Sequence, residues 1–251
     1  MSTDGTTSYS ELSTLARCEQ QWYFKYVERL PDPGNAKTAL GQWMHDATAA
    51  FWKGESWDAP DRDEVWADDA TWLMDRYVKH YAHARMRVRV EATELELQAR
   101  LAPDAPLLRA RVDQLWRIGD KLWLREFKTM SDWSRIDALT VDPQLTLYYG
   151  IVKWSYPELW GIMFDAAKTY HWKRVNHPTS DSFQMIQLDR TDEQVRIAMQ
   201  AAISSVDRMG TLACGDVTPI PNVGRDCSWC PYKLECWDRL AFAQPEIEVV
   251  D

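Results

Sequence analysis

The stretch LLRARVDQLWRIGDKLWLREFKT, residues 107–129, predicts two β-strands joined by a tight turn. The turn is expected at Gly119-Asp120, a dipeptide that often connects the strands of a β-hairpin. Shortly before it, ATELELQARL at 92–101 alternates leucines with polar residues, which is the period of a strand with one buried face. Together the three runs predict an antiparallel meander.

Three charged residues of this meander are candidates for a catalytic site. Glu126 and Lys128 are two residues apart on one strand, so their side chains share a face, and Asp113 on the neighbouring strand can lie beside Glu126. Two carboxylates and an ammonium on an otherwise apolar sheet are costly unless a cation and a reacting group satisfy them. The set suits phosphodiester hydrolysis, in which carboxylates bind Mg²⁺ or Mn²⁺ and a lysine positions water or stabilises developing charge. Exposed strand charges without a catalytic role are the alternative.

Helices and further strands are predicted on both sides of the meander. A capping box of Ser8 and Glu11 opens the first helix, which Pro31 closes. Other helices are predicted at 39–54, 63–84, 143–154 and 191–209, and two more strands at 159–172 and 182–189. This order predicts an α/β fold with a central mixed β-sheet flanked by helices.

Three residues on the predicted helices are further candidates for the site. His45 lies in GQWMHDATAAF, and it gains weight as a metal ligand only if that helix packs against the sheet near Asp113. Gln144 and Tyr148 are four residues apart and share one helix face, where they could hydrogen-bond a phosphate and stack on a base of DNA. A packed histidine and a half-buried tyrosine are the structural alternatives.

The cysteines predict a metal centre. Cys227, Cys230 and Cys236 form a C-x2-C-x5-C run in CSWCPYKLEC, and three thiolates this close can converge on one centre. Cys18, expected in the middle of the first helix, is the natural fourth ligand if the two ends of the chain pack together, whereas Cys214 has no matching partner. The spacing alone leaves a zinc site and an iron–sulfur cluster equally open.

Composition and charge limit the class of protein. The 251 residues, 45% of them hydrophobic, are enough for one sizeable domain, expected at 8–241 between a disordered N-terminal tail, 1–7, and an acidic tail, 242–251. The net charge of −9 argues against a protein that coats nucleic acid, although a local basic groove could still meet phosphates. The sequence shows neither a signal peptide nor an apolar run of roughly 18 residues, so we expect a cytoplasmic protein without membrane contact.

In their order along the chain, these motifs resemble one family. SYSELSTLARCEQQWYFKYV, GQWMH, the VD and EFKT of the two strands, QLTLYY and the terminal CSWCPYKLEC are similar to the RecB-like branch of the PD-(D/E)XK nucleases. The similarity is greatest to the iron–sulfur group that holds the Cas-four-type exonucleases and the AddB nuclease domain. It implies a restriction-endonuclease-like core, metal ligands at His45, Asp113 and Glu126, and a catalytic lysine at Lys128.

The resemblance also implies roles for the remaining candidates. Gln144 and Tyr148 match the Q-x3-Y motif of the family. Four cysteines match the ligands of a [4Fe–4S] cluster that joins the N- and C-terminal helices: Cys18, Cys227, Cys230 and Cys236. Two departures from the family pattern, Ala110 in place of a usual glycine and E-x-K in place of D-x-K, remove no ligand.

The activity implied is that of a metal-dependent DNA exonuclease acting on single-stranded ends or flaps, in phage or bacterial recombination, repair or DNA processing. A homo-oligomer, or an assembly with partner nuclease or recombination proteins, is in keeping with the resemblance. Two alternatives remain: a nuclease that trims DNA before integration in CRISPR adaptation, and a nucleic-acid-binding protein that keeps the fold without the activity. Intact residues at His45, Asp113, Glu126 and Lys128 speak against the second alternative.

Overall fold

The computed structural model describes residues 6–32, 36–101, 103, 106–134, 136–169 and 182–242. Contacts divide the chain into two compact units, where the sequence predicted a single domain at 8–241. The sheet unit comprises Gly34–Ala99 and Arg109–Gln200, and the terminal unit comprises Met1–Pro33, Arg100–Leu108 and Ala201–Asp251. Of the expected acidic tail, residues 243–251 lie outside the described residues. Among the described residues, none of the helices combines the length and the apolar character that a membrane crossing requires.

The sheet unit is built on a mixed β-sheet, as the sequence predicted. β3 (Leu107–Ile118) runs antiparallel to β4 (Lys121–Met130), and β4 runs parallel to β5 (Leu159–Lys168). β6 (Phe183–Leu188) is antiparallel to β5, and β2 (Val88–Arg100) pairs with β3. The expected strand at 182–189 is therefore confirmed, and of the one at 159–172, residues 170–172 lie outside the described residues.

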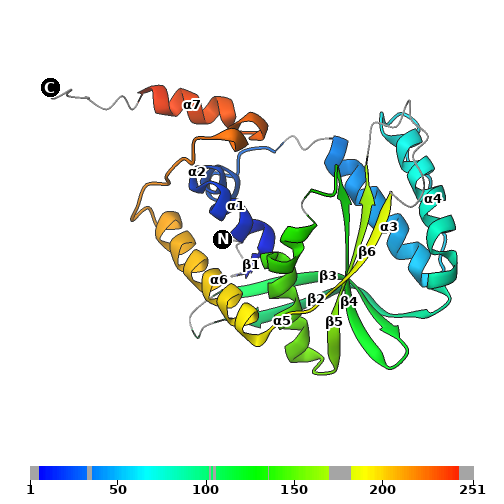
Figure 1. Ribbon diagram of the computed structural model, residues 1–251. Coiled ribbons are helices and arrows are strands. Elements are labelled where there is room, and N and C mark those ends of the chain that lie inside the picture. Colours follow the sequence, from blue (N-terminus) through cyan, green and yellow to red (C-terminus); the bar gives the residue numbers. More distant parts are fainter. Residues whose placement is uncertain are drawn as a thin grey trace. The chain divides into compact units, whose positions relative to one another are not determined.

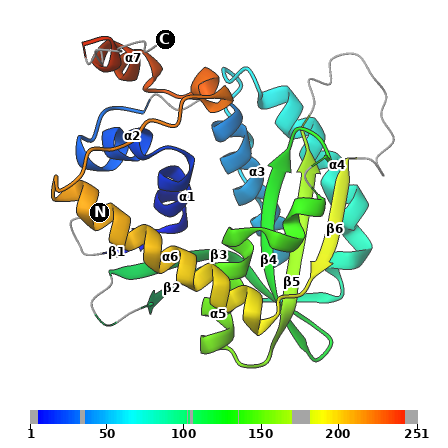
Figure 2. The same cartoon turned by 60° about the vertical axis from the view of Figure 1, so that its left-hand side comes forward.

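Helices cover both faces of this sheet. α3 (Ala36–Lys53) and α4 (Ala67–Arg85) pack together on one face, while α5 (Pro143–Ser155) packs on the other against β4 and β5, as Figure 1 and Figure 2 show. α5 begins where it does because the Asp142 side chain caps it by accepting a hydrogen bond from Leu145 N, with proline in its first turn. All three helices fall where the sequence predicts helices.

An aromatic core separates α3 and α4 from the sheet. Trp52 of α3 and Tyr77 of α4 pack there with Trp123 and Phe127 of β4. These two β4 residues are four positions apart and therefore lie on the same face of the strand. The ring centroids of Trp52 and Trp116 lie 4.2 Å apart. This face of β4 is opposite to the one that carries Glu126 and Lys128, so the core and the candidate catalytic pair occupy different sides of the same strand.

A buried ion pair lies within this aromatic core. Arg125 of β4 and Asp165 of β5 are both fully buried, and Arg125 Nη2 lies 2.7 Å from Asp165 Oδ2. Arg125 also donates to Thr48 Oγ1 on α3 at 2.9 Å and to Gln114 Oε1 on β3 at 3.3 Å. Tyr77 of α4 donates to the same Asp165 carboxylate. The guanidinium and its counter-charge thus connect both helices to the sheet.

Asp165→Ala should lower the free energy of unfolding by about 3–5 kcal/mol, because a guanidinium that cannot lose its proton is left buried without its counter-charge. Asp165→Asn keeps the shape of the side chain and an acceptor oxygen, so it should be less destabilising. Urea unfolding of the two variants checks this, with Glu193→Ala, which breaks an exposed ion pair with Arg196, as the control. Equal unfolding midpoints for Asp165→Ala and the control would show that the buried pair does not stabilise the protein.

The terminal unit brings the two ends of the chain together. It contains β1 (Thr6–Ser8), α1 (Tyr9–Arg17), α2 (Glu19–Trp22), α7 (Lys233–Phe242) and most of α6 (Asp192–Ala213).

Ion pairs and buried residues tie these segments to one another. Arg208 Nε donates to Glu19 Oε1 at 2.7 Å, and Arg239 Nη1 donates to Glu28 Oε1 at 2.6 Å. Thr7 is 2% exposed in β1, although the sequence placed residues 1–7 in a disordered tail. The two ends of the chain therefore pack together in this unit. This was the condition under which Cys18 was expected, from the sequence, to join the other cysteines.

The first helix is shorter than the sequence predicts. Ser8 caps α1 by accepting a hydrogen bond from Glu11 N, as the capping box indicates. The helix ends at Arg17, however, because Cys18 adopts an extended backbone with φ −165° and ψ 118°. The expectation of Cys18 in mid-helix is wrong, and the residue instead separates α1 from α2.

Candidate active site and cysteine pocket

Asp113 lies where β3 and β4 part. The paired register of the two strands runs as far as Gln114 and Arg125, and Asp113 is the residue of β3 directly before Gln114. Its Oδ2 accepts a hydrogen bond from Phe127 N at 2.7 Å. Burial by itself would raise the pKa of Asp113. A hydrogen bond with the side chain of His45, and the positive charge of that side chain, nevertheless hold the pKa below its usual value. The carboxylate is therefore an anion fixed inside the sheet.

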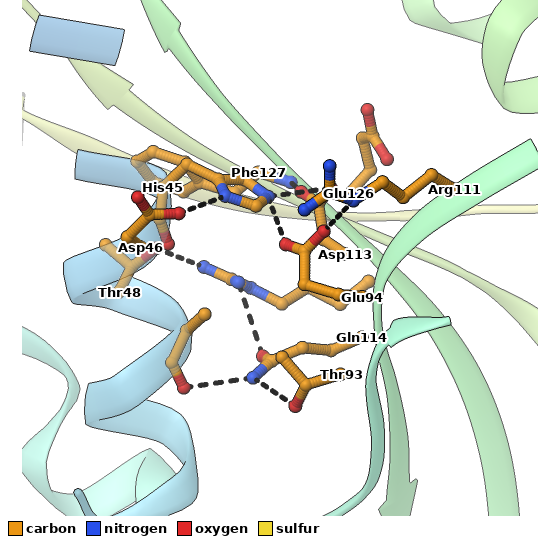
Figure 3. Close-up of polar contacts among 12 residues, drawn as sticks. His45, Asp46, Thr48, Thr93, Glu94, Arg111, Asp113, Gln114, Glu126 and Phe127 are labelled. Atoms are coloured by element: carbon orange, nitrogen blue, oxygen red, sulfur yellow. Dashed lines mark hydrogen bonds and ion pairs between the residues drawn. The ribbon is translucent and has the colours of Figure 1, made fainter. Parts of the chain in front are cut away.

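α3 places His45 against this carboxylate. His45 Nε2 lies 2.9 Å from Asp113 Oδ1, and Nδ1 lies 3.2 Å from Asp46 Oδ1 (Figure 3). The sequence favoured His45 as a metal ligand only if its helix packed near Asp113, and the structure meets this condition. Burial alone would lower the pKa of His45, but its hydrogen bonds to Asp113 and Asp46 and the charge of Glu94 raise it to about 9.

Glu94 of β2 belongs to the same group, and sequence reasoning missed it. Glu94 Oε1 lies 3.3 Å from His45 Nε2, and ligand atoms of His45, Glu94 and Asp113 lie within 4.8 Å of one another. The backbone of Glu94 has a positive φ of 51°, which is uncommon for a residue with a side chain. In the sequence Glu94 is one polar residue of a regular alternation, and no glycine or proline marks the irregular backbone there.

Glu126 and Lys128 share one face of β4, as the period of the strand predicts. Lys128 Nζ lies 2.6 Å from Glu126 Oε1, and the same oxygen accepts a hydrogen bond from Gln144 Nε2 at 3.1 Å. Glu126 is 1% exposed, and its Oε2 has no hydrogen-bond partner among the described residues. Burial and the charge of Asp113 raise the pKa of Glu126 to about 7. Burial works against the charge of Lys128, but Glu126 raises the pKa of this lysine to about 12.

Gln144 and Tyr148 of α5 lie beside this pair. Gln144 donates to Glu126 Oε1 and its side chain is also hydrogen-bonded to Tyr148, which is 7% exposed. Burial, with the charge of Glu126, raises the pKa of Tyr148. So little exposed surface leaves Tyr148 poorly placed to stack on a base, and the observed contacts of the two residues lead instead to the Glu126 carboxylate.

Four of the five cysteines line one pocket of the terminal unit: Cys18, Cys227, Cys230 and Cys236. Backbone amides approach two of the sulfurs, because Asn222 N donates to Cys18 Sγ at 3.4 Å and Gly224 N to Cys227 Sγ at 3.5 Å. Burial raises the pKa of Cys230 and of Cys236, and the neighbouring thiols add to the effect. Cys214 is exposed and is not one of the residues that line this pocket.

Comparison with known proteins identifies the family. The model of the PD-(D/E)XK nuclease superfamily matches residues 6–236. The chain belongs to this superfamily. No curated protein sequence matches it. The matched residues span the sheet unit, in which Asp113 and the Glu126–Lys128 pair lie on the adjacent strands β3 and β4.

Solved structures share the fold of this PD-(D/E)XK nuclease at low sequence identity. A putative exonuclease from Eubacterium rectale superposes with a TM-score of 0.58 at 12% identity, over 98% of this chain and 91% of that chain. The protein SSO0001 superposes with a TM-score of 0.50 at 13% identity, over 94% of this chain and 88% of that chain. At such identities the likeness concerns the fold alone.

The donor set of this PD-(D/E)XK nuclease fits a divalent metal ion. One imidazole nitrogen and carboxylate oxygens offer ligand atoms within 4.8 Å of one another, and groups of both types bind divalent ions. The charges of both Asp113 and His45 affect the pKa of Glu126, and its buried Oε2 lacks a hydrogen-bond partner among the described residues. Of the three ligands expected from the sequence, the structure gathers His45 and Asp113, adds Glu94, and leaves Glu126 beside the group.

Metal binding at this candidate site should become tighter as the pH rises from 7 to 9. His45, with a pKa raised to about 9, carries a proton below that pH, and an ion that uses its nitrogen must displace this proton. The affinity for Mn²⁺ should therefore increase by up to about tenfold per pH unit. Electron paramagnetic resonance of free Mn²⁺ in titrations of the metal-free protein measures it. His45→Gln should remove most of the slope between pH 8 and 9, where Glu126, with a pKa of about 7, is already ionised. An unchanged slope in that variant would exclude His45 as the titrating ligand.

Proposed function

We propose that this protein is a metal-dependent DNA exonuclease that hydrolyses phosphodiester bonds at single-stranded ends or flaps. The observation that carries the proposal is the contact of His45 with Asp113 next to the Glu126–Lys128 pair, which combines a metal-ligand set with an ammonium. The DNA substrate, the exonuclease mode and a setting in phage or bacterial recombination, repair or DNA processing rest on the resemblance to the RecB-like iron–sulfur nucleases.

His45, Asp113 and Glu126 would hold Mg²⁺ or Mn²⁺. His45 presents Nε2 to the site because Asp46 engages Nδ1, and this kind of outer partner fixes the orientation of a ligating imidazole. Asp113 uses Oδ2 for the backbone amide of Phe127 and turns Oδ1 towards His45. When bound, the ion supplies polarisation of the scissile phosphate and acidification of the attacking water.

Lys128 would act on the reacting phosphate directly. Its pKa of about 12 keeps the ammonium charged at neutral pH, and the Glu126 carboxylate holds it at 2.6 Å. A fixed positive charge at this place can orient the attacking water and stabilise the negative charge that develops on the phosphate. Gln144 supports the arrangement because it donates to the oxygen of Glu126 that also contacts Lys128.

Lys128→Ala should slow the Mn²⁺-dependent cleavage of end-labelled single-stranded DNA by about 100- to 1,000-fold, because the charge that stabilises the reacting phosphate is lost. Lys121→Ala is the matched control, since Lys121 belongs to the same strand but lies over the ring of Trp160 at 3.5 Å. Full activity of Lys128→Ala would remove this residue from the mechanism. A wild-type protein that binds DNA but cleaves none with either ion would replace the nuclease proposal with a binding function.

The terminal unit would carry a [4Fe–4S] cluster on Cys18, Cys227, Cys230 and Cys236, as the resemblance implies. Four thiols around one pocket support a shared centre. The choice of an iron–sulfur cluster over a zinc ion rests on the resemblance, because the spacing of the cysteines along the chain suits both.

Protein purified without oxygen should be brown and contain about four irons per chain. Cys227→Ser should lose both the colour and the iron, whereas Cys214→Ser, which changes an exposed cysteine outside the pocket, should keep them. Absorption spectra and metal analysis of the three proteins check this. A colourless protein with one zinc ion would replace the cluster by a zinc site and leave the nuclease proposal standing.

A further inference from the structure

We propose that the Glu94 carboxylate is a ligand of the divalent ion held by His45 and Asp113. This inference rests on the proposed metal-dependent nuclease and adds a residue that neither the VD nor the EFKT motif contains. It assigns to the strand before the two motif strands, β2, a direct part in the active site.

The positions of the three side chains carry the proposal. Glu94 Oε1 and Asp113 Oδ1 approach the same atom, His45 Nε2, at 3.3 and 2.9 Å. The ligand atoms of the three residues lie within 4.8 Å of one another, which is the spacing of oxygens and nitrogens around one Mg²⁺ or Mn²⁺ ion at about 2.0–2.6 Å. An ion placed among them would take the place of the direct contacts that His45 now makes with both carboxylates.

The two oxygens of Glu94 have different surroundings. Oε2 accepts a hydrogen bond from Arg111 on β3, whose side chain is 60% exposed. Oε1 is directed to His45, and Figure 3 shows the Glu94 carboxylate between Arg111 and the imidazole. The oxygen that faces the imidazole is therefore not the one that Arg111 uses, and it is available to an ion.

The backbone of β2 changes phase at this residue. Before Glu94 the exposed positions are odd-numbered, Arg89 and Glu91, whereas after it they are even-numbered, Glu96 and Gln98. Such a shift by one residue, together with the positive φ of Glu94, redirects a side chain relative to a regular strand. A buried acceptor without a partner among the described residues, Glu126 Oε2, stands next to the group and independently indicates a missing cation.

The competing explanation is structural. Glu94 could serve only as the partner of Arg111 across β2 and β3, without contact to any ion. The two explanations differ in what happens when Arg111 is removed. If Glu94 is a ligand, Arg111→Met should leave Mn²⁺ binding unchanged or tighten it, because a competing positive charge disappears. If Glu94 is only the partner of Arg111, removing either residue should weaken Mn²⁺ binding by the same amount.

The test measures Mn²⁺ binding to the metal-free, full-length protein by electron paramagnetic resonance. Glu94→Gln should weaken binding by about 10- to 100-fold, because one anionic ligand is lost. Glu94→Asp, which keeps the charge, should recover part of the affinity. Glu96→Gln is the matched control, since it removes the same charge two residues along the strand from an exposed position, and it should bind as the wild type does. Thermal unfolding of each variant shows that it is folded.

Asp113→Asn separates this proposal from the one on which it rests. Loss of binding in Asp113→Asn with wild-type binding in Glu94→Gln would overturn the role of Glu94 and leave the proposed function intact. Unchanged binding in both variants would overturn the metal site itself. Equal weakening in Glu94→Gln and Arg111→Met would overturn the ligand role in favour of the structural pair. If Glu94→Gln does not fold, Glu94→Asp compared with Glu96→Asp decides the question, and equal affinities there would overturn the proposal.

Discussion

The ion pair of Arg125 and Asp165 is the constraint on which the sheet unit depends. A guanidinium without solvent contact must have all its donors satisfied, because an unpaired buried charge costs far more than an unmade surface contact. Its donors reach β5 through Asp165, α3 through Thr48 and β3 through Gln114. Elements that could slide over an apolar core by small amounts are thereby held at hydrogen-bond distance. Directional contacts, more than the aromatic packing around them, fix where α3 lies on the sheet.

The position of α3 in turn determines the geometry of the candidate active site. Thr48 accepts the hydrogen bond from Arg125 and donates its own hydroxyl hydrogen to the carbonyl oxygen of His45 at 3.1 Å. Gln114, the residue after Asp113, donates to Ala49 O at 3.0 Å. The backbone around His45 and the strand around Asp113 are therefore connected through the same buried network. The 2.9 Å contact between the two side chains is a consequence of that network.

Strand periodicity was enough to predict a large part of this site. The spacing of Glu126 and Lys128 fixed their common face, and the tight turn at Gly119-Asp120 fixed the neighbour relation of their strand with that of Asp113. Those features are local, since they depend on period and on a hairpin. The helices α3 and α5 were also predictable, because the spacing of their apolar residues is a property of consecutive positions.

The features that escaped prediction depend on distant contacts. From the sequence alone, Arg125 would be taken for a solvent-exposed charge. Only the structure shows that Asp165, forty residues later, neutralises it inside the core. Cys18 interrupts the first helix although no proline or glycine in the sequence indicates a break there. The next residue, Glu19, forms an ion pair with Arg208 from the other end of the chain. Glu94 lies in a sequence of regular alternation whose phase nevertheless shifts. In each case tertiary contacts override the local pattern.

The concentration of carboxylates explains why the proposed nuclease site would need a cation before it could bind DNA. Glu94, Asp113 and Glu126 lie near one another in a chain with a net charge of −9, and without an ion they oppose the approach of a phosphate. His45 and Lys128 supply two positive charges, and both are already engaged with those carboxylates. A divalent ion placed among the acids reverses the local sign of the potential. Binding of the phosphate and its hydrolysis would then depend on the same ion, so substrate affinity and rate should share one metal dependence.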